Sequence, residues 1–572
     1  MNRYPDYMRP AEELLVQDFG HDEEGTEIEP EIEEDVSEVE DDIDFHACFE
    51  ETDQSTDGEE EAHEETFWSK TGHLLWSSSP QNGLSRAKMK SIKMTPGPTH
   101  YAISRVDDIK SSFLLFLPDT IEGIILEMTN LEGKRVFGDT WKEIDQVELQ
   151  AYVGLLILAG VYCAKNESPN SLWDAESGRP IFRATMSYQQ FCVLSSVIRF
   201  DKKDTRPGRS RSDKLAPIRS IWDKWVELLP LMYNPGPEVT VDEHLVPFRG
   251  RCPFKVFTAN KPCKYGIKMW AVCDARSSYA WNLQIYTGKS TYRRSEENQD
   301  MYAVLDMTAG LKGHNITCNG FFASYALSQE LLKRKLTMVG AVRKKEPELP
   351  PALLSLKGRG IHSSKFAFTD THTVVSYVPQ KSTNVILMST LHTNAAVSTA
   401  EGGKPVVMQD YDMNKGGVAC LDKLIDSYTC RRITARWPMV LFYNILDVSA
   451  FNAYVVWTVI DPTWNRGKSF KRRLFLAELG KALVTPLIQQ RRHIPRTPAS
   501  ASLVRSMQAP ASEMAAVSEQ GQKRKRCGFC APKDNKTRLR CCECEAYVCR
   551  THSDLRVTCL PCMNSHTDTS TC

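Results

Sequence analysis

The spacing of apolar residues changes several times along this 572-residue chain, and each change predicts a different kind of element. Between residues 100 and 235 apolar residues recur near the helical period, as in Ile121–Leu126, and predict helices. From residue 238 to about 345 the segments are short and rich in β-branched and aromatic residues, which predicts strands, with one helix over residues 321–336. Further strands are expected within residues 347–410, and helices return from residue 416 to about 490.

The longest apolar run covers Ala151–Ala164. It is shorter than the roughly 20 residues that a membrane span needs. We therefore interpret it as a buried core helix and expect no contact with a membrane. We also expect no secretory signal, because Met1–Pro10 is polar and the next segment is acidic.

Charge is distributed very unevenly between the start of the chain and the rest. Residues 1–69 hold 27 acidic and 2 basic residues, a net charge of −25, whereas the remaining residues hold 69 basic and 45 acidic ones, a net charge of +24. An acidic segment with few aromatic residues buries too little apolar surface to offset its ordering entropy, so we predict a disordered tail over residues 1–95. The basic remainder favours a polyanionic partner, foremost nucleic acid, over a solvated basic surface.

Nine of the 18 cysteines lie in the last fifty residues, where Cys and His form four pairs with two-residue gaps. Eight such ligands satisfy two tetrahedral Zn²⁺ ions, which would supply folding energy to a segment with little apolar core. In a cross-brace, pairs one and three hold one ion and pairs two and four the other. The alternatives are disulfides, or a zinc fold for protein contacts as in RING or PHD modules. In chain order, the pairs are Cys527 with Cys530, Cys541 with Cys544, Cys549 with His552, and Cys559 with Cys562.

Three further segments follow one another in order along the chain. Val241-Asp-Glu-His-Leu245 is followed by Ile316-Thr-Cys-Asn-Gly-Phe-Phe322 and by Asn414-Lys-Gly-Gly-Val-Ala-Cys-Leu-Asp422. Alone, Asp242 is best interpreted as a surface acid on a strand. Together, and with Arg431–Pro438 after them, the segments resemble the catalytic motifs of the piggyBac transposase family. The resemblance runs from about residue 100 to the C-terminus.

The resemblance implies a ribonuclease-H-like core in which three aspartates hold two Mg²⁺ ions about 3.5–4 Å apart. Asp242 matches the first aspartate, whereas Asn319 and Ala419 stand where the second and third are expected, and Asp422 matches a further acidic position. Asparagine offers one neutral oxygen and alanine none, so we predict weak Mg²⁺ binding. Helical phase argues against rescue by Asp410 or Asp412.

These patterns together predict a multidomain α/β chain. The ribonuclease-H-like core would occupy residues 238–346 and 411–493 and carry a β-rich insertion domain over residues 347–410. A helical dimerisation and DNA-binding region over residues 96–237 would precede the core. A basic linker over residues 494–526 and a cross-brace zinc-binding domain over residues 527–563 would follow it.

Basic residues near the third motif and before the zinc ligands complete the expected site. They would contact DNA phosphates, which position the duplex without reading its sequence; for the second group, a nuclear localisation signal and solvated linker charge are alternatives. The residues are Arg431, Arg432, Arg436, Lys523, Arg524, Lys525 and Arg526.

The predicted function follows from the resemblance and the lost carboxylates. We expect a domesticated or decayed, piggyBac-derived nuclear protein that binds double-stranded DNA as a homodimer and has little or no transposase activity. One alternative is an active cut-and-paste transposase acting at TTAA. Another is a protein-interaction factor whose zinc-binding tail and acidic N-terminus recruit chromatin proteins.

Overall fold

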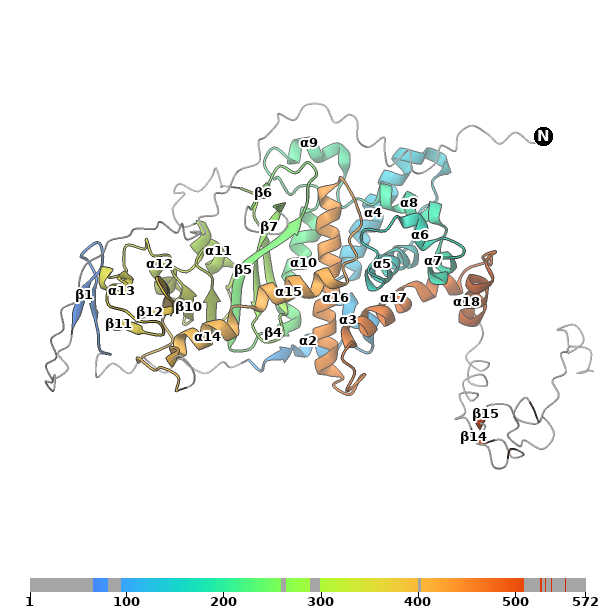
Figure 1. Cartoon of the computed structure of the whole chain (residues 1–572). Coiled ribbons are helices and arrows are strands. Elements are labelled where there is room, and N and C mark those ends of the chain that lie inside the picture. Colours follow the sequence, from blue (N-terminus) through green and yellow to red (C-terminus); the bar gives the residue numbers. More distant parts are fainter. Residues whose placement is uncertain are drawn as a thin grey trace, which may run out of the picture. The chain divides into compact units, whose positions relative to one another are not determined.

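The computed structural model of the chain describes residues 65–80, 94–258, 264–288, 299–399, 403–508, 525–526, 530, 536–537 and 551. These residues belong to two compact units, of which the first ends at Thr497 and the second begins at Pro498. The first unit holds a large mixed sheet and most of the helices (Figure 1).

After a hairpin within residues 65–80, the first unit continues with a mostly helical region whose two ends are joined. The short strands β3 (Gly97–Pro98) and β4 (Tyr233–Asn234) pair antiparallel and bring its start and end together. Between them lie α2 (His100–Ile103), α3 (Ile109–Leu114), α4 (Asp119–Phe137), η1 (Gly138–Thr140), α5 (Gln146–Val161), α6 (Pro169–Leu172), α7 (Pro180–Thr185), α8 (Tyr188–Val197), η2 (Lys203–Thr205), α9 (Arg206–Arg209) and α10 (Arg219–Met232).

Eleven strands form one mixed sheet in the order β1-β2-β11-β12-β13-β10-β9-β5-β7-β6, with β8 also paired to β7. The strands are β1 (Thr66–Trp68), β2 (Leu75–Ser77), β5 (Glu238–Pro247), β6 (Lys255–Phe257), β7 (Tyr265–Asp274), β8 (Ala280–Ile285), β9 (Asn315–Cys318), β10 (Thr337–Ala341), β11 (Ser364–Phe368), β12 (Thr373–Gln380) and β13 (Thr383–Ser389). Three helices lie between these strands in the chain, namely α11 (Gln299–Met307), α12 (Tyr325–Lys333) and α13 (Pro351–Leu354).

Four helices follow the sheet in the chain and pack on it or on the helical region. They are α14 (Val406–Asn414), α15 (Gly417–Ser427), α16 (Trp437–Ile460) and α17 (Lys471–Gln489). Among the described residues, α16 is the helix whose length and mean hydropathy of 1.5 would allow it to cross a membrane. Since 89% of its apolar window is buried inside the fold, it has the character of a core helix.

Helix α5 confirms that the longest apolar run is a buried core helix. Asp145 and Glu148 form a capping box at its start, each side chain accepting from the other residue's backbone N–H. Every residue of Leu149–Val161 is buried. At Gly154 the helix approaches α17 so closely that a Cβ there would lie 2.9 Å from the carbonyl oxygen of Gly480. The absence of a side chain at this position therefore sets the packing of α5 on α17.

Helix α15 is seated directly on the central strand β5. It packs on β5 and β7, while α14 packs on β5, β10 and β13 (Figure 1). The hydroxyl of Thr240 donates to the carbonyl of Asn414 at 2.6 Å. A Cβ on Gly417 would lie 2.6 Å from the same hydroxyl oxygen. The start of α15 can therefore reach β5 only because residue 417 lacks a side chain.

Residues 65–80 depart from the disordered tail predicted for residues 1–95. They form the β1–β2 hairpin, and Ser77 of β2 pairs with Phe368 of β11. Trp76 is fully buried, and its Nε1 donates to the carbonyl of Glu348 at 2.9 Å. The prediction is wrong for this segment because its aromatic residues supply apolar surface that the preceding acidic stretch lacks.

Residues 347–410 extend the main sheet, although the sequence predicted a separate insertion. Strand β13 pairs antiparallel with β10, so β11, β12 and β13 continue the sheet beyond the core strands. Val375 and Leu387 pack in one buried cluster with Val339 of β10 and Val407 of α14. A shared sheet and a shared cluster make this segment part of the same core.

The second unit contains one helix and one strand pair among its described residues. Helix α18 (Pro498–Gln508) lies in the stretch where a linker was expected. Strands β14 (Lys525–Arg526) and β15 (Lys536–Thr537) pair antiparallel. They flank, in sequence, the first predicted pair of zinc ligands.

Candidate functional site

Asp242 and Asn319 lie side by side because β5 and β9 pair in parallel. Cys318, the last residue of β9, is in register with Val241, so Asn319 follows next to Asp242. The Nδ2 of Asn319 donates to Oδ1 of Asp242 at 2.6 Å, and its Oδ1 accepts from the backbone N–H of Phe321 at 3.0 Å. The structure thus brings the first two predicted positions together, and it engages both polar atoms of Asn319 within the protein.

Helix α15 carries the third predicted position and Asp422. Ala419 is exposed and offers no oxygen. One turn further, Oδ1 of Asp422 lies 2.5 Å from Nδ1 of His244. The other ring nitrogen, Nε2, lies 2.9 Å from Nδ2 of the buried Asn444. Because side chains alternate along a strand, His244 projects from the same face of β5 as Asp242.

His244 and Asn444 are functional-site neighbours that the sequence reasoning missed. The signal for His244 was present, since it stands two residues after Asp242 and must share its face of the strand. Asn444 gave no such signal, because it belongs to α16, 200 residues further along the chain. The result is a His–Asp contact that ties α15 to β5.

The donors around Asp242 do not fit a pair of divalent metal ions. Its Oδ1 accepts from the backbone N–H of Glu243 at 2.7 Å as well as from Asn319. Mg²⁺ requires hard oxygen ligands, whereas here an amide N–H faces the carboxylate. Within the described ranges, no group of three or more His, Cys, Asp or Glu side chains is placed to hold a metal ion.

Asp410 and Asp412 are engaged by basic side chains. Oδ2 of Asp410 lies 2.8 Å from Nε2 of His392. Asp412 accepts from Lys404 and from Lys415. Burial acts to raise the pKa of Asp412, but these two ammonium groups bring it below its ordinary value. Neither carboxylate is therefore available to replace the two that the site lacks.

Two buried thiols lie near the carboxylates of the site. Burial raises the pKa of Cys318, and the charge of Asp242 raises it further. Burial likewise raises the pKa of Cys273, with a contribution from Asp422. Both groups are free, buried cysteines that favour the neutral thiol.

A large basic groove lies at the end of β5, beside these residues. Its empty volume is about 2150 Å³, and an adjoining cleft of about 850 Å³ is lined by His244 and Asp422. The groove and the cleft share Pro247, Asp426, Thr429 and Arg431, so the groove leads to the site. The cationic side chains that line the groove are Lys165, Arg249, Lys255, Lys264, Arg431 and Arg432.

The three arginines predicted near the third motif have different surroundings. Arg431 lines both the groove and the cleft. Arg432 is buried and donates to the backbone carbonyls of Ala164 and Glu167, and burial lowers its pKa. Arg436 donates to three carbonyls at the C-terminal end of α8, those of residues 195, 196 and 198. Arg432 and Arg436 thus bind backbone carbonyls of the helical region, whereas Arg431 lines the groove and the cleft.

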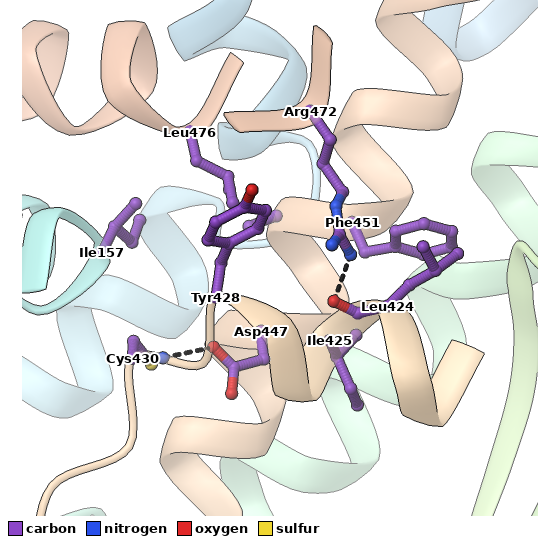
Figure 2. A pocket seen from close by; sticks show the side chains of 10 residues that line it. Ile157, Leu424, Ile425, Tyr428, Cys430, Asp447, Phe451, Arg472 and Leu476 are labelled. Carbon is purple, nitrogen blue, oxygen red and sulfur yellow. Dashed lines mark hydrogen bonds between the residues drawn. The ribbon is translucent and has the colours of Figure 1, made fainter. Parts of the chain in front are cut away.

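A smaller cavity lies where α15, α16 and α17 meet (Figure 2). Asp447 of α16 accepts from the backbone N–H of Cys430 at 2.8 Å and from the hydroxyl of Thr429 at 2.5 Å. Burial raises the pKa of Asp447 to about 6. Arg472 of α17 donates to the carbonyl of Leu424 near the end of α15. These contacts hold Thr429 and Cys430 in place, and these two residues connect the end of α15 to Arg431 in the groove.

Comparison with known proteins places the chain in a family. A family model described as transposase IS4 matches residues 110–454, more than half of the chain. The chain belongs to this transposase family, as a piggyBac-type member.

Relatives of this piggyBac-type chain include two human proteins and a solved DNA complex. Human piggyBac transposable element-derived protein 3 is 21% identical over 364 residues, which are 59% of this chain and 60% of that protein. The human chimeric ERCC6-PGBD3 protein is also 21% identical, over 34% of its length. The cryo-EM structure of the piggyBac transposase synaptic complex with hairpin DNA matches with a TM-score of 0.69 and 29% identity. That match covers 80% of this chain and 98% of the solved one.

Most residues predicted in the C-terminal part of this piggyBac-type chain lie outside the described residues. Lys525 and Arg526 form β14, whereas Lys523 and Arg524 are not described. Of the eight predicted zinc ligands, Cys530 is described. The other seven lie outside the described residues, and they are Cys527, Cys541, Cys544, Cys549, His552, Cys559 and Cys562. The zinc sites therefore stay a prediction.

Proposed function

We propose that this chain is a transposase-derived DNA-binding protein whose degenerate site does not carry out strand transfer. The observation that carries the proposal is the hydrogen bond of 2.6 Å from Nδ2 of Asn319 to Asp242. Two-metal chemistry needs carboxylate oxygens that clamp both ions, and an amide donor at this position opposes that arrangement. Because Asn319 and Ala419 replace two of the three catalytic aspartates of the family, Asp242 is the one of the three that is retained.

The strand arrangement supports a ribonuclease-H-like core as the frame of this site. Strand β5 is antiparallel to β7 and parallel to β9, so positions 242 and 319 become neighbours, and α15 then passes over β5. Such a frame depends on apolar packing and not on the catalytic carboxylates. It can therefore persist after the charge needed for catalysis has been lost.

Double-stranded DNA is the partner that the basic groove fits best. The solved structure that this chain resembles over 80% of its length is described as a complex with hairpin DNA. Phosphates would meet the exposed side chains of Arg249 and Lys264, which line the groove. Contacts of this kind hold a duplex in place independently of its sequence.

DNA binding is tested with the full chain and two pairs of lysine or arginine variants. Each of Arg249→Ala and Lys264→Ala should weaken binding and lower the slope of log K against log salt by about 0.9 for each lost phosphate contact. Lys357→Ala and Lys381→Ala are the matched controls, since both side chains are exposed and neither lines the groove. Equal losses in both pairs would exclude the groove as the DNA-binding surface.

Catalytic competence is tested with purified full chain, DNA carrying TTAA-flanked ends, and Mg²⁺ or Mn²⁺. We expect neither hairpin formation nor excision. The variant carrying Asn319→Asp and Ala419→Asp then separates loss at the site from loss elsewhere, because regained excision would show that the rest of the machinery is intact. Excision by the unmodified chain would favour the active transposase and defeat the proposal.

The Cys-rich tail is proposed to bind two structural Zn²⁺ ions. The support is the spacing of the four ligand pairs, which supplies eight soft donors for two tetrahedral sites. Elemental analysis of the purified chain should find close to two zinc ions per chain. A zinc content near zero would exclude these sites. Chromatin proteins captured through this tail, without DNA binding, would favour a protein-interaction factor.

A nuclear location and a homodimer complete the proposal. The basic run Lys523–Arg526 has the composition of a nuclear localisation signal. A fluorescent fusion should be nuclear, and replacing all four basic residues by alanine should release it to the cytoplasm. Sedimentation equilibrium should give twice the 64.7 kDa mass of the chain, and a monomer at micromolar concentration would exclude the dimer.

A further inference from the structure

The basic groove has a potential partner of opposite charge within the same chain. The sequence holds no Lys or Arg between Arg9 and Lys70, and residues 1–69 carry a net charge of −25. Asp426, the acidic residue in the groove lining, already pairs with Lys165 at 2.8 Å. Arg249 and Lys264 are exposed and form no ion pair within the described residues. The groove therefore presents cationic charge that the described fold leaves uncompensated.

The groove also exposes apolar side chains, which a phosphate backbone does not need. Ile433 is 88% exposed and Tyr265 is 38% exposed, and both line the groove. The acidic segment alternates acids with aliphatic residues, as in Glu31-Ile-Glu-Glu-Asp-Val36. A ligand that combines carboxylates with aliphatic side chains matches both features of the lining.

The acidic segment is long enough to reach the groove. It joins the described fold at Glu65, directly before β1, and the groove borders β6 at the other end of the strand order. Nine strand spacings of about 4.8 Å separate the two by roughly 43 Å. An extended chain covers about 3.3 Å per residue, so roughly 13 residues would span this distance.

We infer that the acidic segment before Glu65 docks in the basic groove and excludes DNA from it. Its carboxylates meet Arg249, Lys264 and their neighbours, while its aliphatic residues cover Ile433. Bound within the same chain, the segment has a high effective concentration at the groove, so weak contacts suffice to occupy it. DNA must then displace it, which makes the groove self-regulated; this consequence for DNA rests on the function proposed above.

Carbodiimide cross-linking of the full chain tests the docking without using DNA. This reagent joins a carboxylate to an amine only when the two are in contact. We expect cross-links from residues 22–50 to Lys255 and Lys264 and none to the exposed controls Lys357 and Lys381. Mixing isotope-labelled with unlabelled chain separates links within one chain from links between chains. Equal yields at groove and control lysines, or none at the groove, would overturn the inference.

Variants of the full chain then test whether the docking depends on charged and apolar side chains of the groove. Arg249→Glu and Ile433→Ser should each lower the cross-link yield at Lys255 and Lys264. Lys357→Glu, a charge reversal at an exposed site outside the groove, should leave that yield unchanged. All three positions are exposed, so the melting temperature should stay that of the parent and exclude misfolding as the cause.

DNA affinity provides the functional readout. Neutralising Glu31, Glu33, Glu34 and Asp35 to their amides should raise the affinity of the full chain for DNA about tenfold at low salt, and the gain should shrink as salt screens the charges. A gain without cross-links at the groove would mean simple repulsion between the tail and DNA, and would defeat the docking. Cross-links in a chain that never binds DNA would leave the docking standing and defeat the proposed DNA-binding function.

Discussion

Asn319 donates its side-chain amide to the carboxylate of Asp242 over 2.6 Å, and the carbonyl oxygen of the same amide accepts from the backbone. This contact explains how a site with two lost carboxylates stays ordered. Asp242 is stabilised by hydrogen bonds from the protein where a catalytic site of this kind would use metal ions. The amide at position 319 therefore supplies a hydrogen bond that stabilises Asp242 without metal.

Asn319→Asp should make the stability of the chain depend on divalent metal. It replaces the amide donor by a second carboxylate beside Asp242, and like charges at this distance disfavour each other's ionised form. We expect a loss of about 1–2 kcal/mol without metal, because the two carboxylates would be half-buried and would lack the amide donor. Thermal unfolding with and without millimolar Mg²⁺ checks this, since metal should raise the melting temperature of the variant but not that of the parent.

Asn319→Ala is the matched control for that experiment. It also removes the amide donor but adds no charge, so it should lose stability without gaining a response to Mg²⁺. A metal response in the alanine variant, or none in the aspartate variant, would contradict the role assigned to the amide.

Asp422→Ala should destabilise the fold more than Asp422→Asn. Alanine leaves Nδ1 of the buried His244 without its partner at 2.5 Å, which costs about 1–3 kcal/mol. Asparagine keeps an oxygen that accepts from the ring, so most of the contact survives. Denaturant unfolding of both variants checks the difference, with Lys423→Ala as an exposed neighbour on the same helix. Equal losses for alanine and asparagine would show that the ring contact contributes nothing.

The close packing of α15 on β5 can be tested by substituting two adjacent glycines. A Cβ on Gly417 would lie 2.6 Å from the hydroxyl of Thr240, whereas a Cβ on Gly416 meets nothing within 4 Å. Gly417→Ala should therefore cost about 1–3 kcal/mol through overpacking. Gly416→Ala should cost less than Gly417→Ala, because its Cβ meets no atom and its backbone conformation is one that alanine adopts readily. A harmless Gly417→Ala would mean that α15 shifts freely on the strand.

Asp447 should make the chain more stable as pH falls from 7 towards 4. Burial raises its pKa in the folded state to about 6, so the folded chain takes up a proton before the unfolded chain does. By linkage, stability then falls as pH rises through this window, by on the order of 3 kcal/mol in total. Asp447→Asn should remove this part of the dependence. Melting temperatures measured between pH 4 and 8 check it, and an identical pH slope in the variant would exclude Asp447 as the source.

Several elements were predictable because their signals are local. The apolar run that becomes α5 is buried from Ala151 to Val161, as expected for a core helix. The neighbourhood of Asp242 and Asn319 was also predictable, since the resemblance to a known family implies parallel strands that carry both positions. These features depend on residue types and spacing within short segments, which the sequence displays directly.

The sequence alone determined the family, the helical and strand-forming regions, the buried helix α5, and the loss of carboxylates at positions 319 and 419. Tertiary structure decided which polar groups are engaged and by what. Arg431 and Arg432 are adjacent and chemically identical, yet Arg432 is buried and donates to a carbonyl 268 residues earlier in the chain, while Arg431 lines both the groove and the cleft. The same holds for His244 with Asp422, and for Trp76 with Glu348. A side chain's partner is set by the packing of distant segments, so no local pattern can reveal it.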